Sequence, residues 1–192
     1  MRTFIAIPLP GELLHYLTEI QTLLRKGIRS GVAWVNPTSI HLTLKFLGEI
    51  NEKQLPDVRM KLADCLKNTS KFQLTSGGIG CFPGITNPKV LWSGIQMNPN
   101  LEDIQFKIET TLSQIGFEKE ERKFSPHLTL GRVKTGLLRP EQEFLQKIIE
   151  QEAHHDPMIF VVNQVVLYKS DLTRSGAIYS AISINQLIEN NR

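Results

Sequence analysis

The hydrophobic positions in the first half of the chain predict strands and helices in alternation. An apolar run over residues 3–7 predicts a strand. From Pro10 to Gly27, leucine and isoleucine recur with the helical period, which is typical of a helix with one buried face. Further along, the pattern predicts extended segments over 32–35 and 40–47, an amphipathic helix over 55–66 and a short strand over 72–74.

The second half repeats this order of elements. It predicts a strand over 90–95, a helix capped by Asn98 and ended by Gly116, and a strand over 126–132. These are followed by a helix begun at Pro140, a β segment over 158–168 and a closing strand over 177–184. Residues 170–176 are rich in turn formers, as in connections between antiparallel strands.

The recurring order predicts an α+β fold with an internal repeat. We expect one bilobal domain over residues 1–192, built from approximate repeats 1–88 and 89–192, with elements that can be exchanged between the lobes. Each of the two pseudo-symmetric lobes would have a mainly antiparallel sheet covered by helices, with the active-site groove between the lobes. Many α/β folds alternate strands and helices, so the order of elements alone is weak evidence for a repeat.

One tetrapeptide strengthens the case for a repeat. The sequence HLTL occupies residues 41–44 and again 127–130, each time in the strand that follows the first helix of its half. A single His-x-Thr in a chain with 5 histidines says little. Two copies with the same apolar spacers, at equivalent places, indicate a shared role.

The spacing of the motif places its polar residues on one side of each strand. Side chains alternate along a strand, so His41 shares a face with Thr43, and His127 shares a face with Thr129. The leucines of both motifs, together with Phe46, are expected to point the other way, where helices can cover them. If the two halves are related by approximate two-fold symmetry, their open faces meet and present two imidazoles and two hydroxyls to a ligand.

This set of side chains suits the chemistry of a phosphate diester. The ordinary pKa of histidine is about 6.5, so one imidazole can act as a base while the other, protonated, acts as an acid. In a 2′,3′-cyclic phosphate, one would activate a water for in-line attack on phosphorus and the other would protonate the departing ribose oxygen. Thr43 and Thr129 would donate hydrogen bonds to the non-bridging oxygens as negative charge develops there.

Two charged residues are candidates for contact with the substrate. Arg132 follows His127 by five residues, and its guanidinium could bind a phosphate with two parallel hydrogen bonds. Lys45 is expected on the same strand face as His41. For both residues, the alternative is a solvated charge on a strand.

Aromatic residues could stack on a terminal base, as recognition of single-stranded RNA often requires. Phe82 is the leading candidate, because a Phe-Pro turn flanked by glycines suits the edge of a groove. Phe4, Trp34 and Tyr168 are further candidates. Packing in the core is the alternative for all four.

Composition limits the class of protein further. The chain is 41% hydrophobic with a net charge of +3 and a pI near 8.9, so any basic surface for a polyanion must be local. The 2 cysteines form neither a disulfide framework nor a CxxC motif. No segment has the pattern of a signal peptide or a membrane span, so we expect a cytoplasmic protein that does not bind a membrane, and a monomer.

Four segments carry a resemblance to a known family: RTFIAIPLP near the start, HLTLKFLG at 41–48, GCFPG at 80–84 and SPHLTLGR at 125–132. With these, the chain resembles the two-histidine phosphoesterases, specifically the bacterial and archaeal RNA 2′,3′-cyclic phosphodiesterases, also called 2′-5′ RNA ligases. The resemblance implies a bilobal α+β fold that needs no metal or cofactor. It also implies hydrolysis of a terminal 2′,3′-cyclic phosphate to a 2′-phosphate. Some members join or cleave 2′-5′ linkages reversibly in transfer RNA halves.

The resemblance also implies a role for each motif residue. His41 matches the proton donor and His127 the proton acceptor, while Thr43, Thr129 and Arg132 match phosphate contacts. The two motifs are nearly identical, so they give no internal reason to assign acid and base this way round. The segment 134–157, with its adjacent histidines at 154 and 155, has no counterpart in the motifs that carry the resemblance.

Three alternatives remain open. Two histidines could share a zinc ion, but catalytic zinc normally takes three protein ligands, and threonine is a poor one. The chain could instead bind RNA ends without chemistry. Finally, the same chemistry could act on another small cyclic phosphate or on 2′-5′ oligonucleotides.

Overall fold

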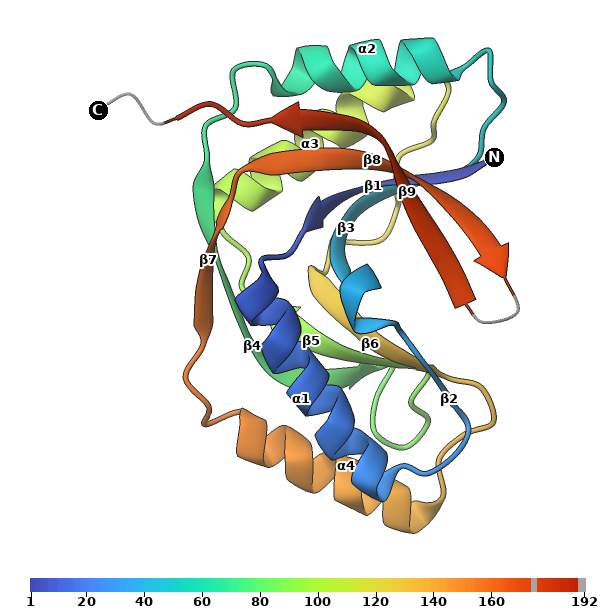
Figure 1. Cartoon of the computed structure of the whole chain (residues 1–192), viewed down its shortest axis with the longest axis vertical. Helices are drawn as coiled ribbons and strands as arrows, with labels where there is room; N and C mark the ends of the chain where they lie inside the picture. Colours follow the sequence, from blue (N-terminus) through green and yellow to red (C-terminus); the bar gives the residue numbers. More distant parts are fainter. Residues whose placement is uncertain (174–175, 190–192) are drawn as a thin grey trace.

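The computed structural model describes residues 1–173 and 176–189, which form four α-helices and one curled antiparallel sheet (Figure 1). The helices are α1 (Gly11–Gly27), α2 (Leu55–Leu66), α3 (Pro99–Ser113) and α4 (Arg139–Glu152), with a single 3-10 turn, η1, at Pro37–Ser39. The strands are β1 (Arg2–Pro8), β2 (Val32–Trp34), β3 (His41–Glu49), β4 (Phe72–Phe82), β5 (Val90–Ile95), β6 (His127–Val133), β7 (Met158–Val162), β8 (Gln164–Thr173) and β9 (Gly176–Gln186). The expected α+β class is confirmed.

Strands of both halves share a single sheet. Its order is β7-β4-β5-β6-β3-β1-β8-β9, with β2 paired to β6. Only Asn163 separates β7 from β8, yet β4, β5, β6, β3 and β1 lie between them in the sheet. Two residues span at most about 7 Å, so the sheet must curl to bring these strands together. The structure thus differs from the expected pair of separate sheets, because β3 and β6 join the two halves.

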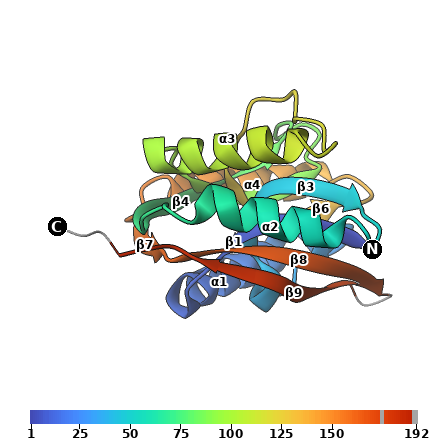
Figure 2. The ribbon, with the colours of Figure 1, turned by 90° about the horizontal axis from the view of Figure 1, so that it is seen from above.

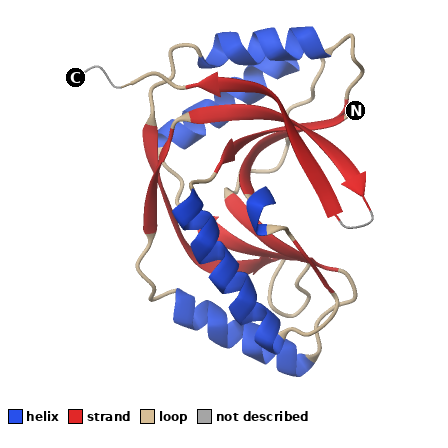
Figure 3. Ribbon diagram, in the orientation of Figure 1, coloured by secondary structure: helices blue, strands red, loops and turns tan. Residues whose placement is uncertain are grey.

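The helices cover the two ends of the molecule in pairs (Figure 3). α1 contacts α4, and α2 contacts α3, so each pair combines one helix from each half of the sequence. Seen from above, α3 and the β8–β9 hairpin lie on opposite sides of the molecule (Figure 2). None of the helices in the described ranges is long and apolar enough to cross a membrane.

The apolar faces predicted from the helical period form the core. Leu13, Leu17 and Leu24 of α1 are at most 1% exposed, and Ile104 and Ile108 of α3 are fully buried. Burial of each such side chain stabilises the fold by about 1.5–3 kcal/mol. These helices therefore fix the strands that carry the two HLTL motifs.

β4 is longer than the short strand expected over 72–74. The expectation was too short because the glycines of this stretch have the pattern of a turn. Gly78 lies in a bulge opposite β5 with a positive φ of 67°, a backbone conformation that glycine adopts readily. At Gly80, a Cβ atom would lie 2.4 Å from the ring of Trp92, so the close packing of this ring requires glycine.

The C-terminal strands also differ from the sequence-based expectation. The β segment expected over 158–168 is two strands, which pair with different partners: β7 with β4, and β8 with β1 and β9. Residues 170–173, expected in a turn, continue β8 and pair with β9, while 174 and 175 lie outside the described residues. The expected antiparallel pairing of the strands on either side is confirmed.

Candidate active site

The two HLTL motifs lie on neighbouring antiparallel strands. Leu42 of β3 pairs with Leu128 of β6, and both leucines are fully buried. Extending this register by one residue in each direction places His41 opposite Thr129, and Thr43 opposite His127. Diagonal partners across two strands are about 7–8 Å apart, so the two imidazoles flank a space large enough for a phosphate group.

Each imidazole is oriented by a hydrogen bond to the backbone carbonyl two residues before it. The Nδ1 of His41 is 2.7 Å from the carbonyl oxygen of Ser39, and the Nδ1 of His127 is 2.8 Å from that of Ser125. A carbonyl oxygen only accepts, so Nδ1 carries the proton in both rings. The Nε2 atom of each ring is therefore the one that can take up or release a proton.

The sequence contains a signal for this arrangement that the HLTL motif alone does not reveal. A serine precedes each histidine by two residues, in SIHLTL and SPHLTL. The carbonyl that orients each ring belongs to the backbone, so the serine side chain is not what makes the contact. The repeated spacing nevertheless marks the equivalent turn before each motif.

Aromatic rings surround His41 and break the symmetry between the motifs. Its imidazole stacks on Phe4, with ring centroids 4.6 Å apart, and meets the edge of Tyr179 at 5.2 Å. His127 instead meets Phe82 edge-on at 5.2 Å. Tyr179 was not among the sequence-based candidates, because no motif marks it within β9.

This environment acts on the protonation of His41. Burial lowers the pKa of His41 below its ordinary value of 6.5, and the positive charge of Arg132 lowers it further. The hydrogen bond to Ser39 opposes both effects because it favours the charged ring. The free protein therefore holds His41 neutral over a wider pH range than an exposed histidine.

We expect the imidazole of His41 to titrate below pH 6.5 and Arg132→Ala to raise its pKa, because the nearby positive charge is lost. Between the lowered pKa and 6.5, the unfolded chain binds more protons than the folded protein, so the contribution of His41 to stability declines as the pH falls through this window. Titration of ¹⁵N-labelled histidine by NMR measures the pKa. The conservative Arg132→Lys should leave it near the starting value; a pKa indifferent to Arg132→Ala would contradict the assigned cause.

Beyond the HLTL motif, a bulge in β3 reverses the alternation of side chains. The pairing of β3 with β1 skips Leu44, so Leu44 and Lys45 both face the core, 3% and 5% exposed. Phe46 is 63% exposed, and its ring lies 6.2 Å from that of Phe4, which stacks on His41. Both expectations for this stretch are wrong for the same reason: Lys45 does not share the histidine face, and Phe46 does. We therefore do not place Lys45 in contact with the substrate.

The second motif strand has the same irregularity. The pairing of β6 with β5 skips Leu130, so Leu130 and Gly131 are both buried and Arg132 is exposed. Arg132 is therefore the counterpart of Phe46 in the other half. The positive charge of Arg132 is close enough to lower the pKa of His41 on the neighbouring strand.

Phe82 lies at the end of β4 beside the second motif. Its ring contacts His127 and also Trp92, at 5.0 Å, so it is half-buried at the edge of the site. Trp34, another aromatic candidate, lies under the guanidinium of Arg25 at 5.1 Å and packs against the core. Phe82 thus contacts a motif histidine, whereas Trp34 packs beside Gly131.

A pocket of about 380 Å³ opens beside His41. Tyr168 and Tyr179 form part of its wall, and burial raises the pKa of Tyr168. Thr38 of η1 and Asn36, which caps this turn, add polar groups, and the amide oxygen of Asn36 accepts a hydrogen bond from the Thr38 backbone at 3.1 Å. Aromatic walls with a few oriented polar groups are typical of sites for small organic ligands.

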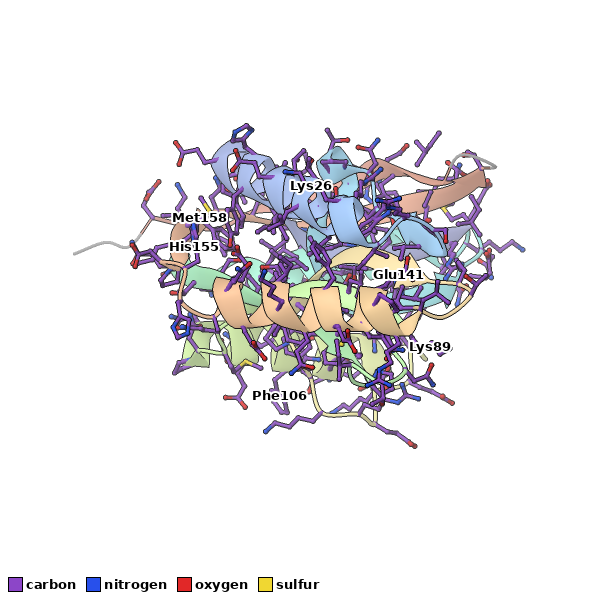
Figure 4. All side chains as sticks on the ribbon, turned by 90° about the horizontal axis from the view of Figure 1, so that it is seen from below. Lys26, Lys89, Phe106, Glu141, His155 and Met158 are labelled. Carbon is purple, nitrogen blue, oxygen red and sulfur yellow. The ribbon has the colours of Figure 1, made fainter. Side chains whose placement is uncertain are left out.

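The adjacent histidines at 154 and 155 lie away from the two motifs. In the view of Figure 4, His155 lies beside Met158 at one end of α4, and Glu141 lies at the other end. The ring of His155 packs against Tyr16 of α1 at 5.1 Å. Among the described residues, no group of three or more histidine, cysteine, aspartate or glutamate side chains is placed to hold a metal ion.

Comparison with known families finds one match that spans most of the chain. A family model described as LigT like Phosphoesterase matches residues 7–92 and 95–179. Each of these ranges contains one HLTL motif.

Individual proteins and solved structures are similar over nearly their full lengths. RNA 2′,3′-cyclic phosphodiesterases from Thermotoga maritima and Methanocaldococcus jannaschii are 34% and 35% identical, each over 95% of this chain and over 93% and 98% of their own. A crystal structure from Thermus thermophilus superposes with a TM-score of 0.80 at 25% identity, covering 100% of both chains. Escherichia coli LigT complexed with 3′-AMP superposes with a TM-score of 0.74 at 21% identity, covering 98% of each chain.

Proposed function

Because the chain belongs to the LigT-like phosphoesterase family, we propose that it hydrolyses the 2′,3′-cyclic phosphate at an RNA end to a 2′-phosphomonoester, with His41 and His127 as acid and base. One observation carries the proposal: the antiparallel pairing of the two HLTL strands, which puts both histidines and both threonines on one face. The names of relatives at 34% and 35% identity support RNA cyclic phosphate as the substrate.

In the proposed reaction, water attacks phosphorus in line with the bond to the 3′ oxygen. The Nε2 of His127 takes a proton from the water, and the Nε2 of His41 gives a proton to the departing 3′ oxygen. One P–O bond forms as the other breaks, and the product carries a 2′-phosphate and a 3′-hydroxyl. Each Nδ1 keeps its proton and donates it in a hydrogen bond to a backbone carbonyl throughout the reaction. This bond orients the ring so that Nε2 faces the phosphate.

The neighbouring residues would stabilise the charge on phosphorus. Thr43 and Thr129 are half-buried on the histidine face and would donate to the non-bridging oxygens. The exposed guanidinium of Arg132 would bind the same anion. Arg132 lowers the pKa of His41 in the free protein, and a bound phosphate would offset that charge, so the substrate would help to protonate the proposed donor.

The nucleoside next to the phosphate would bind on aromatic surfaces beside the histidines. The pocket at His41, walled by Tyr168 and Tyr179, and the ring of Phe82 at His127 offer two such surfaces, one on each side of the phosphate site. A base that stacks on a protein ring contributes about 1–3 kcal/mol to binding, so a terminal nucleoside would lower KM.

Product analysis tests the reaction and the nucleoside contact together. An oligoribonucleotide ending in 2′,3′-cyclic phosphate should give a 2′-phosphomonoester, and a base-free ribose 2,3-cyclic phosphate should be hydrolysed with a higher KM. Binding of the oligonucleotide without turnover would instead identify a protein that only binds RNA ends. Equal KM values for both substrates would favour a small cyclic phosphate as the substrate.

The same pair of histidines could also catalyse a joining reaction, in which the 5′-hydroxyl of a second RNA replaces water as the nucleophile. In this joining reaction, an RNA 2′,3′-cyclic phosphate and a 5′-hydroxyl end, such as those of transfer RNA halves, would give a 2′-5′ linkage. A 2′-5′ linked product from two such ends would support it.

A further inference from the structure

A buried ion pair lies directly behind the first motif strand. The ammonium of Lys45 is 2.5 Å from the carboxylate of Glu109 on α3, and the two residues are only 5% and 6% exposed. Charged side chains are rarely buried to this extent unless they are paired. Lys45 follows Thr43 by two residues, immediately after the bulge that turns its side chain away from the histidine face.

The pair also binds the segment that leads into the second motif. Lys45 donates a second hydrogen bond, of 2.7 Å, to the backbone carbonyl of Glu118, and the carboxylate of Glu109 accepts from the backbone nitrogen of Glu120 at 3.3 Å. This segment continues to Ser125, whose carbonyl orients His127. The ion pair therefore connects the strand of Thr43 to the chain that places His127, and these two residues face each other across the strand pair.

Stability alone does not explain why two charges are buried here. Burying an ion pair removes both charges from water, and well-packed apolar residues of similar volume are often equally stabilising or more so. An apolar pair could fill the same space between β3 and α3. It could not bind the backbone of Glu118 and Glu120, so the polar contacts to this segment are what the charges provide.

The second motif strand is held by a similar device. Gln21 of α1 is 2% exposed, and its amide donates to the backbone carbonyls of Leu130 and Val35, both at 2.8 Å. Leu130 is the residue skipped at the bulge of β6. A buried polar side chain therefore supports the bulge of each motif strand from a helix of the other half. Glu109 of α3 contacts Lys45 of β3, and Gln21 of α1 contacts Leu130 of β6.

We propose that Lys45 and Glu109 are positioning residues, which hold the segment before His127 against the β3 strand and so fix the imidazole of His127 opposite Thr43. They do not touch the substrate. The inference rests on the proposed function of His127. It predicts that removing the pair lowers kcat while leaving the binding of substrate nearly unchanged.

The test replaces the pair with apolar residues, because single variants would leave one buried charge unpaired and could fail to fold. Lys45→Met/Glu109→Leu should fold with a thermal midpoint near that of the parent protein. Its kcat should fall about ten- to a hundredfold, as expected for a displacement of a catalytic group by about 1 Å, with KM within about twofold. NMR of ¹⁵N-labelled histidine should show His127 losing its fixed Nδ1–H tautomer while His41 keeps its own.

Asp103→Leu/Lys107→Met is the matched control, since it removes an exposed ion pair of 2.6 Å from the same helix. It should leave kcat and both histidine signals unchanged. A folded Lys45→Met/Glu109→Leu variant with the parent kcat and an unchanged His127 signal would overturn the proposal. If the parent protein itself failed to hydrolyse cyclic phosphate, the proposed function would fail, and the His127 signal would still decide whether the pair positions this ring.

Discussion

Replacing either His41 or His127 by alanine is expected to lower the rate of cyclic-phosphate hydrolysis by about 10²–10⁴-fold, the range for loss of a general acid or base. Each variant leaves one proton transfer without a catalyst. The remaining histidine cannot serve both transfers, because its Nδ1 is bonded to a backbone carbonyl and only its Nε2 is free. The double variant should be little slower than the worse single one, since the two groups act in the same step. Single-turnover rates at saturating substrate measure the effect.

His15→Ala is the control for these variants. Its side chain is 78% exposed and lies 3.6 Å from Glu19 on α1, away from the motif strands, so the parent rate should be retained. Thr43→Ala and Thr129→Ala should each cost less than a histidine variant, because a hydroxyl only donates a hydrogen bond to the phosphate. Normal hydrolysis by both histidine variants would refute the assignment.

The second large effect concerns which histidine is the acid. A cyclic phosphate with sulfur in place of the bridging 3′ oxygen leaves as a thiolate, which needs no proton because thiols ionise near pH ~8.5. We expect His41→Ala to recover most of the lost rate on this substrate, about 10²-fold or more, since protonation of the leaving group is the step it lacks. His127→Ala should remain slow, because water still has to lose a proton. Rates for both variants on the oxygen and sulfur substrates complete the comparison.

The lowered pKa of His41 makes this experiment informative. Burial holds His41 neutral in the free protein, which would also suit a base, whereas the proposed mechanism assigns His41 the role of proton donor. Rescue of His127→Ala in place of His41→Ala would exchange the two roles. A failure of sulfur to rescue either variant would mean that protonation of the leaving group does not limit the rate.

Much of this site could be predicted from the sequence because strand geometry is regular over short distances. The alternation of side chains placed His41 with Thr43, and His127 with Thr129, and burial of the leucines between them supports that placement. The repeat of HLTL suggested that the motifs act together. The sequence could not show that they lie on adjacent strands of one sheet, because the pairing of β3 with β6 depends on how both halves fold around each other.

The errors arose where the backbone departs from regular geometry. A bulge at the last leucine of each motif reverses the alternation, and in β3 it buries Lys45 and exposes Phe46. A bulge has little sequence signal of its own when no glycine marks it, as in β3. In β4 the opposite happened: glycines that permit a bulge and close packing of Trp92 were interpreted as a turn.

The position of β1 has a consequence for synthesis on the ribosome. This apolar strand, with Phe4, Ile5 and Ile7 buried, lies between β3 and β8 in the finished sheet. β3 is translated soon after it, but β8 begins only at Gln164. At about 5–20 residues per second, one edge of β1 stays without its hydrogen-bonding neighbour for roughly 10–30 seconds. A nascent chain with such an open edge is prone to aggregate, so chaperones would have their main opportunity to bind before β8 emerges.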